Sequence, residues 1–570
     1  MRVIADVATA RTVAAGEPAR AAGRVCRRHV DESFSLFSKS PAMLIAPRSL
    51  PTFVNEPIRA FRDPAERAGM EAALARVRSI AGRRYPLVID GQRIDGSQTI
   101  ASINPARPAD VIGDVVAATL DDASHALDAA TRAFGVWSKT SFAERSDLLV
   151  RAAAAIRRRK DEFNALMVLE VGKTWIEAEA DTAEAIDFLE YYARQALALA
   201  DPPPLIPSPL PESNVLRYLP LGVGAIIPPW NFALAIMAGM TCAAIVTGNT
   251  VVLKPSPDAA VVAAHFVDLL HELGLPTGVV NFVPGDGPTV GEAIVTDPRT
   301  RFISFTGSKA VGLRINELAA RTGPGQRWIK RVVAEMGGKD AIVVADDADI
   351  PAAVAGVIGS AFGFGGQKCS ACSRVIVDAR IYDRFVDLLR AGAQTLVVGD
   401  PARPDVDLGP VINEKAAQKI GSYIEIGERE GRLVAGGKRL AESGYFFEPT
   451  IFADVLPSGR IAREEIFGPV LAVIRADDFE HALALANDTE FGLTGSVYTS
   501  DPARIRLARE TFFVGNLYIN RKCTGAYVGV HPFGGFNMSG TDSKAGGYDY
   551  LLLFVQPQSI AERTVTSTAV

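Results

Sequence analysis

The stretch Val223-Gly224-Ala225-Ile226-Ile227 decides the fold, because it is the first of four short apolar runs in the middle of the chain. The others are TVVL at 250–253, VVNF at 279–282 and FISF at 302–305, and segments of helical character separate them. Strands that alternate with helices are typical of βαβ units, in which the strands run parallel. We therefore predict an α/β fold with a doubly wound, Rossmann-like cofactor domain, whose ligand binds at the carboxyl ends of the strands.

The region before these strands is predicted to be mostly helical. Leu127–Phe134, Ala143–Lys160 and Ala180–Ala200 carry apolar residues at three- and four-residue spacing, and Pro202 follows the last of them. That spacing indicates amphipathic helices, and proline ends a helix. Earlier in the chain, Asp90-Gly91 sits between LVI at 87–89 and QRI at 92–94, which predicts a β-hairpin.

Composition places the chain among globular proteins with more than one domain. It has 570 residues, of which 48% are hydrophobic and 22% charged, with a net charge of −5, so neither disorder nor nucleic-acid binding is expected. Its five cysteines form an odd, scattered set, which favours a reducing, cytoplasmic location over a disulfide framework. The apolar run at 233–246 is shorter than the roughly 20 residues that a membrane span needs. We predict a core helix there and no membrane segment.

The first residues differ in character from the rest. Residues 1–42 are rich in arginine and alanine and poor in acids. We predict a disordered tail. An organelle transit peptide has a similar composition, so an organellar matrix is the alternative location.

A thiol behind a glycine-rich turn is the main chemical signal. In FGGQKCSAC at 364–372, Cys369 follows Lys368 and stands 34 residues after Glu335. A thiol attacks as thiolate, and a nearby cation, backbone N–H groups or a helix N-terminus could lower its pKa from about 8.5. We predict that Cys369 is a nucleophile and Glu335 a general base. The simplest alternative is a buried cysteine and a surface acid.

Polar residues also follow the predicted strands. Asn231, after a diproline, could donate a side-chain N–H to a developing oxyanion. Lys254 ends one strand, and the segments 285–291 and 305–308 could bring backbone N–H groups to a pyrophosphate at a helix N-terminus. A solvated lysine and ordinary turns are the alternatives, since neither glycine segment is a G-x-G-x-x-G motif.

Together these pieces resemble the aldehyde dehydrogenase superfamily over roughly residues 50–560. The motifs that carry the resemblance are PWN at 229–231, LKP at 253–255, FTGS at 305–308, EMGGK at 335–339, GQKC at 366–369 and EEIFGP at 464–469. The resemblance implies that Cys369 forms a thiohemiacetal and then a thioester with an aldehyde. It further implies that Glu335 activates the hydrolytic water, and that Asn231 and the Cys369 backbone N–H form an oxyanion hole.

The resemblance also implies a nicotinamide cofactor. Its implied contacts are Ile227, Pro228, Trp230, Lys254, Ser256, Gly287, Phe305, Thr306, Gly307, Ser308, Glu465 and Phe467. NAD is the expected cofactor. Many family members carry a glutamate where this chain has Pro257, and that carboxylate would repel a 2′-phosphate, so NADP is the alternative. No metal is implied.

Three segments resemble one group of the superfamily, the L-glutamate γ-semialdehyde (1-pyrroline-5-carboxylate) dehydrogenases. They are residues 53–57, 520–529 and 531–547. The implied substrate is an aldehyde with an amino-acid end, oxidised to L-glutamate in proline degradation. The implied substrate contacts are the backbone N–H groups of Gly525 and Ala526, the Ser370 hydroxyl, Phe232, Phe533, Lys368 and Glu190. For Gly525-Ala526 a plain turn is the alternative.

The domain organisation follows from the same resemblance. Residues 43–206 and 223–333 are expected to form the dinucleotide-binding domain and 334–526 the catalytic domain. Residues 207–222 and 527–570 are expected to form an oligomerisation flap and C-terminal segment, with strands at Asn214–Pro220 and near Tyr550–Gln558. Exposed strand edges seek a partner, so we predict a homodimer or a higher homo-oligomer. A separate proline dehydrogenase would act upstream, since this chain is too short to contain one.

Three other functions compete with this interpretation. The first is an aldehyde dehydrogenase for another aliphatic aldehyde. The second is a thiol–disulfide oxidoreductase, because Cys369 and Cys372 form a C-x-x-C motif; the histidines show no zinc-ligand spacing relative to these thiols. The third is a non-catalytic dinucleotide-binding protein, because fold does not fix function.

Overall fold

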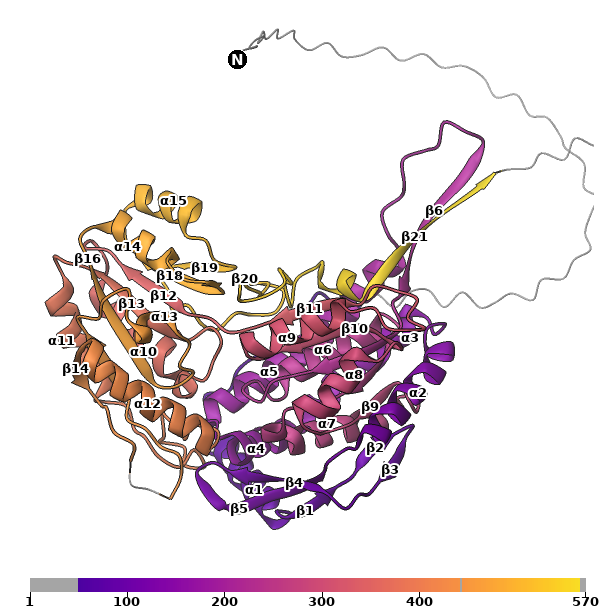
Figure 1. Ribbon diagram of the computed structural model, residues 1–570, viewed down its shortest axis with the longest axis horizontal. Coiled ribbons are helices and arrows are strands. Elements are labelled where there is room, and N and C mark those ends of the chain that lie inside the picture. The colour runs from indigo at the N-terminus through magenta and orange to yellow at the C-terminus, as the bar shows by residue number, and fades with distance from the viewer. Residues whose placement is uncertain (1–49, 441–442, 564–570) are drawn as a thin grey trace, which may run out of the picture. The chain divides into compact units, whose positions relative to one another are not determined.

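The first sheet of the computed structural model has seven strands and contains all four runs that the sequence predicted (Figure 1). Five neighbouring strands run parallel, and a β-hairpin is added at one edge. In spatial order the strands are β11 (Arg331–Glu335), β10 (Thr300–Thr306), β7 (Val223–Ile227), β8 (Thr250–Leu253), β9 (Val280–Phe282), β2 (Leu87–Ile89) and β3 (Gln92–Ile94). The predicted hairpin is confirmed, since Asp90 and Gly91 have φ of 53° and 74°, values that a two-residue hairpin turn requires.

Helices cover both faces of this sheet. One face packs against α6 (Ala235–Val246) and α7 (Ala260–Glu272), and the other against α2 (Leu120–Trp137), α8 (Glu292–Thr296) and α9 (Lys309–Ala320). Adjacent residues of β8 face opposite cores: Val251 and Leu253 belong to the first and Val252 to the second. The sheet is therefore doubly wound, as predicted, and the apolar run at 233–246 forms the buried helix α6.

The second sheet also has seven strands and lies beside the first in Figure 1. Only its edge strand β14 is antiparallel. The order is β14 (Arg432–Ala435), β15 (Thr450–Ala453), β16 (Val470–Ala476), β13 (Cys372–Asp378), β12 (Asp340–Val344), β18 (Thr494–Tyr498) and β19 (Asn516–Ile519). One face packs against α10 (Ile350–Phe362) and α11 (Tyr382–Ala393), and the other against α12 (Glu414–Glu430), α13 (Arg460–Arg463), α14 (Phe479–Asn487) and α15 (Pro502–Thr511).

The remaining elements surround the first sheet. The helices are α1 (Pro64–Ser79), α3 (Phe142–Arg158), α4 (Lys160–Val171) and α5 (Trp175–Ala200), and β1 (Arg83–Tyr85), β5 (Arg107–Val116) and β4 (Thr99–Asn104) form a small sheet. The helix predicted over Ala143–Lys160 is α3, which ends two residues earlier at Arg158, and Lys160 begins α4. A short pair joins β17 (Phe491–Gly492) to β20 (Phe536–Asn537).

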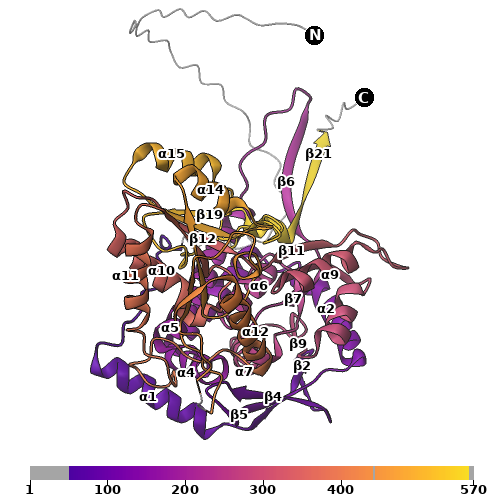
Figure 2. The ribbon, with the colours of Figure 1, turned by 60° about the vertical axis from the view of Figure 1, so that its left-hand side comes forward.

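A two-stranded antiparallel arm projects away from both sheets (Figures 1 and 2). It pairs β6 (Glu212–Pro220) with β21 (Val555–Arg563) along nine residues. The predicted strand near Tyr550–Gln558 was partly wrong, because Tyr550–Phe554 is a 3₁₀ turn. Tyr550, Leu551 and Phe554 are all buried, and Tyr550 stacks on Tyr192 while Phe554 packs on Phe302. In an extended strand the adjacent Tyr550 and Leu551 would point to opposite faces, so they could not both reach the same core.

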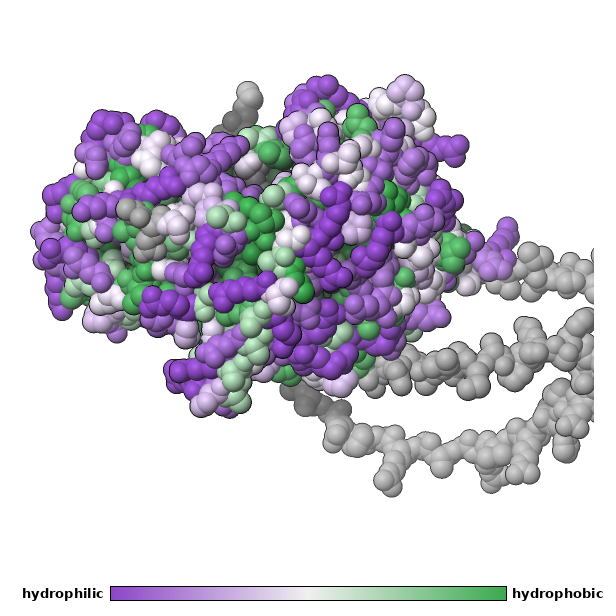
Figure 3. Space-filling view, turned by 90° about the horizontal axis from the view of Figure 1, so that it is seen from below, coloured by the Kyte–Doolittle hydropathy of each residue, from purple (hydrophilic) through white to green (hydrophobic). Residues whose placement is uncertain are grey.

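The structure describes residues 50–440 and 443–563, and the predicted tail over residues 1–42 lies outside them. The described residues form one compact unit, and the predicted boundary between residues 333 and 334 falls inside β11. Within the described part of the chain, no helix has the length and apolar character needed to cross a bilayer. The face in Figure 3 is mainly hydrophilic, with apolar side chains in small groups and one larger group near its middle.

Candidate active site

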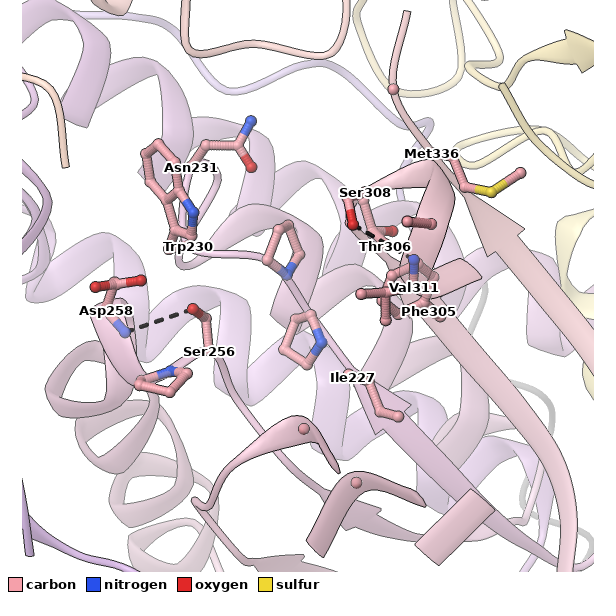
Figure 4. A pocket seen from close by; sticks show the side chains of 18 of the residues that line it. Ile227, Trp230, Asn231, Ser256, Asp258, Phe305, Thr306, Ser308, Val311 and Met336 are labelled. Atoms are coloured by element: carbon pink, nitrogen blue, oxygen red, sulfur yellow. Dashed lines mark hydrogen bonds between the residues drawn. The ribbon is translucent and has the colours of Figure 1, made fainter. Parts of the chain in front are cut away.

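A cavity of about 980 Å³ lies at the carboxyl ends of β7, β8 and β10, where parallel sheets bind ligands. Segments that follow β11 and belong to the second-sheet region close its other side. All of the residues predicted for the cofactor line it, together with Asn231 and Cys369. They are Ile227, Pro228, Trp230, Lys254, Ser256, Gly287, Phe305, Thr306, Gly307, Ser308, Glu465 and Phe467. Figure 4 shows Ile227, Trp230, Asn231, Ser256, Phe305, Thr306 and Ser308 among the lining residues.

The N-terminus of α9 opens onto this cavity. Ser308 caps the helix by accepting the Val311 N–H, and Ser256 accepts the Asp258 N–H at 3.4 Å in the neighbouring strand end (Figure 4). At Gly287 an added Cβ would meet nothing within 4 Å, so the backbone there is open to a ligand. Free N–H groups and the helix dipole at such an N-terminus suit a phosphate.

Two ionisable groups line the cavity in positions that suit sugar hydroxyls. Burial lowers the pKa of Lys254 to about 8, and its ammonium donates to the Pro255 carbonyl at 3.2 Å. Burial raises the pKa of Glu465, whose carboxylate accepts the Gly338 N–H at 3.1 Å. A Cβ on Gly337 would lie 2.3 Å from a Glu465 oxygen, so only glycine lets Glu465 approach this backbone.

Two aromatic rings that line the cavity, Trp230 and Phe467, pack together near the loop that precedes Cys369. Trp230 packs edge-on against Phe467 at 5.7 Å and against Phe364 at 6.2 Å between ring centroids. Phe364 and Phe467 both have positive φ, at 51° and 62°, which large residues rarely adopt. Backbone strain of this kind is typical of functional sites, where the surrounding fold imposes it.

The loop before Cys369 is fixed by its glycines and by Gln367. Gly366 has φ of 68°, and a Cβ there would lie 2.3 Å from the Gly468 carbonyl oxygen. The buried Gln367 amide accepts the Ile412 N–H at 2.9 Å and donates to the Phe364 and Pro410 carbonyls. These contacts hold the loop against the second-sheet region and so position the thiol.

Asn231 lies beside that loop. Its side-chain amide donates to the Gln367 carbonyl at 3.0 Å. An asparagine amide has two N–H donors, so one orients the side chain and the other remains for a ligand oxygen in the cavity that Cys369 also lines.

The expectation that Lys368 lowers the pKa of the Cys369 thiol is wrong. Burial raises the pKa of Cys369, and the charges of Asp340, Glu335 and Glu465 raise it further, while the Ser370 N–H opposes them. The Lys368 ammonium instead pairs with Glu177 on α5, at 2.8 Å. Attack by this thiol therefore requires a base that removes its proton.

Glu335 is the carboxyl group suited to that task. Glu335 ends β11, and its carboxylate accepts hydrogen bonds from the Ser543 hydroxyl at 2.5 Å and the Gly535 N–H at 3.1 Å. In this position Glu335 is not one of the residues that line the cavity. Burial raises the pKa of Glu335 to about 8, and Ser543 and Gly535 oppose that rise. The group is half ionised near pH 8, which suits a general base at neutral to mildly alkaline pH.

The residues predicted for the substrate lie partly next to Cys369 and α5 and partly in the C-terminal segments. Ser370 is buried next to Cys369, and Phe232 lies under the Lys173 ammonium at 4.4 Å from its ring centroid. Phe533 forms a backbone bridge with Ala545, and the Gly525-Ala526 turn is partly exposed. The structure does not bring Glu190 to this group, because Glu190 pairs with Arg194 at 2.7 Å and with Arg157 at 3.5 Å.

Glu184 is the acid that the sequence interpretation missed. Burial raises its pKa to about 8, and the charges of Asp181, Lys173 and Lys368 act on it. The sequence contained a signal, since Glu177, Asp181 and Glu184 are spaced four and three residues apart and therefore share one face of α5. Two of these acids pair with lysines, Glu177 with Lys368 and Asp181 with Lys173 at 2.8 Å, whereas no ion pair of Glu184 is found in the described structure.

Known proteins resemble the chain over most of its length. The model of a family described as "Aldehyde dehydrogenase family" matches residues 93–560. The chain belongs to the aldehyde dehydrogenase family. A curated relative named 1-pyrroline-5-carboxylate dehydrogenase, from a Geobacillus species, is 55% identical over 510 residues, covering 90% of this chain and 99% of the relative.

Solved structures of the aldehyde dehydrogenase family agree with the fold. A 1-pyrroline-5-carboxylate dehydrogenase from Thermus with bound NAD is 51% identical, with a TM-score of 0.89, covering 90% of this chain and all of that one. Proline utilization A from Bdellovibrio bacteriovorus is 44% identical with a TM-score of 0.89, and the match covers 90% of this chain and 54% of that one.

In this aldehyde dehydrogenase, the second thiol of the C-x-x-C motif, Cys372, contacts groups other than Cys369. The buried Cys372 thiol donates to the Arg374 carbonyl at 3.2 Å and hydrogen-bonds the thiol of Cys523. Within residues 50–440 and 443–563, no group of three or more histidine, cysteine or acidic residues is arranged to hold a metal ion.

Proposed function

We propose that the protein is an NAD-dependent L-glutamate γ-semialdehyde (1-pyrroline-5-carboxylate) dehydrogenase that forms L-glutamate. The observation that carries this proposal is that Cys369 and Asn231 share one cavity with Lys254, Glu465 and the α9 N-terminus. The Geobacillus and Thermus relatives bear that name, and the Thermus relative holds bound NAD.

The first half of the reaction forms a covalent bond to Cys369. Because the thiol has a raised pKa, a base must take its proton as the sulfur attacks the aldehyde carbon, and we assign this to Glu335, whose charge acts on the thiol. The Asn231 amide then donates to the thiohemiacetal oxyanion, an interaction worth about 3–4 kcal/mol in comparable sites. Loss of hydride from the thiohemiacetal carbon re-forms the carbonyl and gives the thioester, and a nicotinamide bound in the cavity would accept that hydride.

The second half hydrolyses the Cys369 thioester. Glu335 releases the first proton to solvent and, as carboxylate, takes a proton from the attacking water. Ser543 and Gly535 hold that carboxylate, so it reaches the thioester by turning away from them. The acid product then leaves, and Cys369 recovers its proton.

The amino-acid end of the substrate would lie between α5 and the loop at 520–529. The N–H groups of Gly525 and Ala526 and the Ser370 hydroxyl are the donors for its carboxylate, because a carboxylate accepts several hydrogen bonds. Phe232 and Phe533 would flank its aliphatic chain. We assign the substrate ammonium to Glu184 instead of Glu190, since a buried carboxyl group regains its charge when a cation binds beside it.

NAD is the proposed cofactor, with NADP as a second substrate for the same site. Pro257 begins a short 3₁₀ turn at the cavity wall, and no carboxylate stands at that position to repel a 2′-phosphate. Lys415 and Lys419 also line the cavity, as does Arg314, which pairs there with Glu292 at 3.0 Å. The two lysines would reduce the electrostatic cost of the extra phosphate.

The proposal extends to partners and location. Among the described residues, β6 and β21 pair only with each other, so the arm has two free strand edges, and we infer a homodimer or a higher homo-oligomer built through it. The upstream oxidation of proline belongs to a separate protein, and the cytoplasm is the proposed location, with the organellar matrix as the alternative.

The test is steady-state oxidation of L-glutamate γ-semialdehyde with NAD and with NADP, run beside propanal. We expect a strong preference for the semialdehyde, loss of activity in Cys369→Ala, and retention in the matched control Cys372→Ala. Equal or better turnover of propanal would assign the enzyme to another aliphatic aldehyde. Loss of activity only in Cys372→Ala would favour thiol–disulfide chemistry, and inactivity with both aldehydes would favour a non-catalytic role.

A further inference from the structure

Arg521 makes an unusual pair of contacts at the start of the 520–529 loop. One nitrogen of its guanidinium, Nη2, donates to the carbonyl oxygens of Thr524 at 3.0 Å and Gly525 at 2.9 Å. The guanidinium also lies over the buried Tyr518 ring at 4.4 Å, and Nη1 is 3.4 Å from His531 Nε2. Arg521 is therefore held from one side while it binds two successive carbonyls on the other.

These contacts fix the direction of two N–H groups. The peptide bonds here are trans and planar, so the C=O and N–H of one peptide point in opposite directions. The Thr524 carbonyl shares its peptide with the Gly525 N–H, and the Gly525 carbonyl shares its peptide with the Ala526 N–H. Because both carbonyls point to Arg521, both N–H groups point to the opposite side of the chain.

The left-handed conformation of Gly525, with φ of 78°, accompanies this arrangement. Successive N–H groups that face the same way around a left-handed residue form an anion-binding concavity. A side chain at Gly525 would be strained by this φ, and its Cβ would lie 3.3 Å from Lys522 Cε. Position 525 therefore requires glycine if Arg521 is to bind the Thr524 and Gly525 carbonyls in this arrangement.

The loop begins beside the nucleophile. The Cys523 thiol donates to the Ser370 carbonyl at 3.4 Å, and Ser370 follows Cys369 directly. Burial lowers the pKa of Lys522, and Lys368 and Glu177 are the next charges that act on it. The two N–H groups therefore lie close in the chain to the cations Arg521 and Lys522, in a segment that contacts the residue after Cys369, where an anionic end of the substrate is favoured.

We propose that Arg521 is the positioning residue that aims the Gly525 and Ala526 N–H groups at the substrate carboxylate, and that it thereby sets the preference for a carboxylate-bearing aldehyde. This inference rests on the proposed function. Arg521 touches neither the aldehyde carbon nor the cofactor, and it acts through the two peptides. A lysine would not replace it, because an ammonium lacks the flat guanidinium that lies over Tyr518 while one nitrogen binds both carbonyls.

The experiment compares Arg521→Lys and Arg521→Ala with the wild type. Arg475→Ala is the matched control, because Arg475 also lies over a tyrosine ring, at 4.0 Å, and donates to a backbone carbonyl, but it lies on β16 and contacts Ala379 and Asp383 instead of the 520–529 loop. The measurements are kcat and KM for the semialdehyde and for propanal, inhibition by glutarate with propanal as substrate, and thermal unfolding.

We expect KM for the semialdehyde and the inhibition constant of glutarate to rise about 10- to 100-fold in both variants, since hydrogen bonds to a charged group are lost. The kcat/KM for propanal should stay within about twofold of wild type, as it should in Arg475→Ala, because propanal has no carboxylate for the two N–H groups to bind.

A parallel fall for both aldehydes, or no change in either, would overturn the inference. If the wild type itself shows no preference for the semialdehyde, the proposed function fails, and the role of Arg521 fails with it. If the wild type and the variants keep the same preference, only the role of Arg521 fails.

Discussion

Removal of the Ser543 hydroxyl should shift the pH dependence of thioester hydrolysis. Ser543 donates to the Glu335 carboxylate at 2.5 Å and is the largest of the influences that oppose the effect of burial on the Glu335 pKa. Ser543→Ala leaves the Gly535 N–H contact in place, at 3.1 Å, and removes only the hydroxyl. The base form of Glu335 is the ionised one, so activity should rise with pH through the pKa and then level off.

The magnitude follows from the contact. The wild-type pKa of Glu335 is about 8. A hydrogen bond to a charged group contributes about 1.5–3 kcal/mol, and one pKa unit corresponds to about 1.36 kcal/mol, so the variant pKa should rise by about 1–2 units. At pH 7.5 the ionised fraction would fall from about one quarter to about 3% or less, which lowers a rate that depends on the carboxylate by about eightfold or more.

The assay is kcat against pH from 6 to 10 with saturating semialdehyde and NAD, with the first turnover followed separately by NADH absorbance. The matched control is Ser539→Ala, because Ser539 lies in the same segment as Ser543. The buried Ser539 hydroxyl accepts the Gly492 N–H and makes no contact with Glu335. Its midpoint should equal that of the wild type. An unchanged midpoint in Ser543→Ala would refute the reasoning, since either Glu335 is not the titrating base or the hydroxyl does not stabilise its charge.

Three other predictions test the fold and the cavity. Gly366→Ala should destabilise the protein by about 2–4 kcal/mol in denaturant unfolding, because the Gly366 φ is 68° and an added Cβ would meet the Gly468 carbonyl. The control Gly359→Ala, on the open face of α10, should be neutral or stabilise the protein by up to about 1 kcal/mol. Equal effects of the two substitutions would contradict the loop geometry. Glu465→Gln should weaken NAD binding about tenfold in a fluorescence titration. The control Glu464→Gln should not change NAD binding, because the Glu464 carboxylate pairs with Arg460 outside the cavity. If only Glu464→Gln weakened binding, Glu465 would not belong to the cofactor site. Truncation after Phe554 removes β21 and should lower the mass measured by light scattering to that of the monomer, and an unchanged mass would show that assembly uses another surface.

The sequence by itself was sufficient for features that neighbouring residues determine. The spacing of apolar residues predicted the strands of the first sheet and the buried helix α6, because burial on one or both faces imposes that periodicity. Asp90-Gly91 predicted its hairpin because a two-residue turn needs positive φ. The motifs around Asn231, Lys254, Ser308 and Cys369 predicted which residues line the cavity, since each follows a strand or a glycine turn.

Only the tertiary structure decided the properties that depend on distant partners. The Glu335 carboxylate has its pKa set by burial and by Ser543 and Gly535, which follow it much later in the chain. Likewise Lys368 neutralises Glu177 instead of activating Cys369, and α5 presents Glu184 rather than Glu190 near these charges. Local sequence limits the backbone conformation of each segment, whereas burial and charge pairing arise from segments that meet only after folding, and these set the protonation and orientation of the catalytic groups.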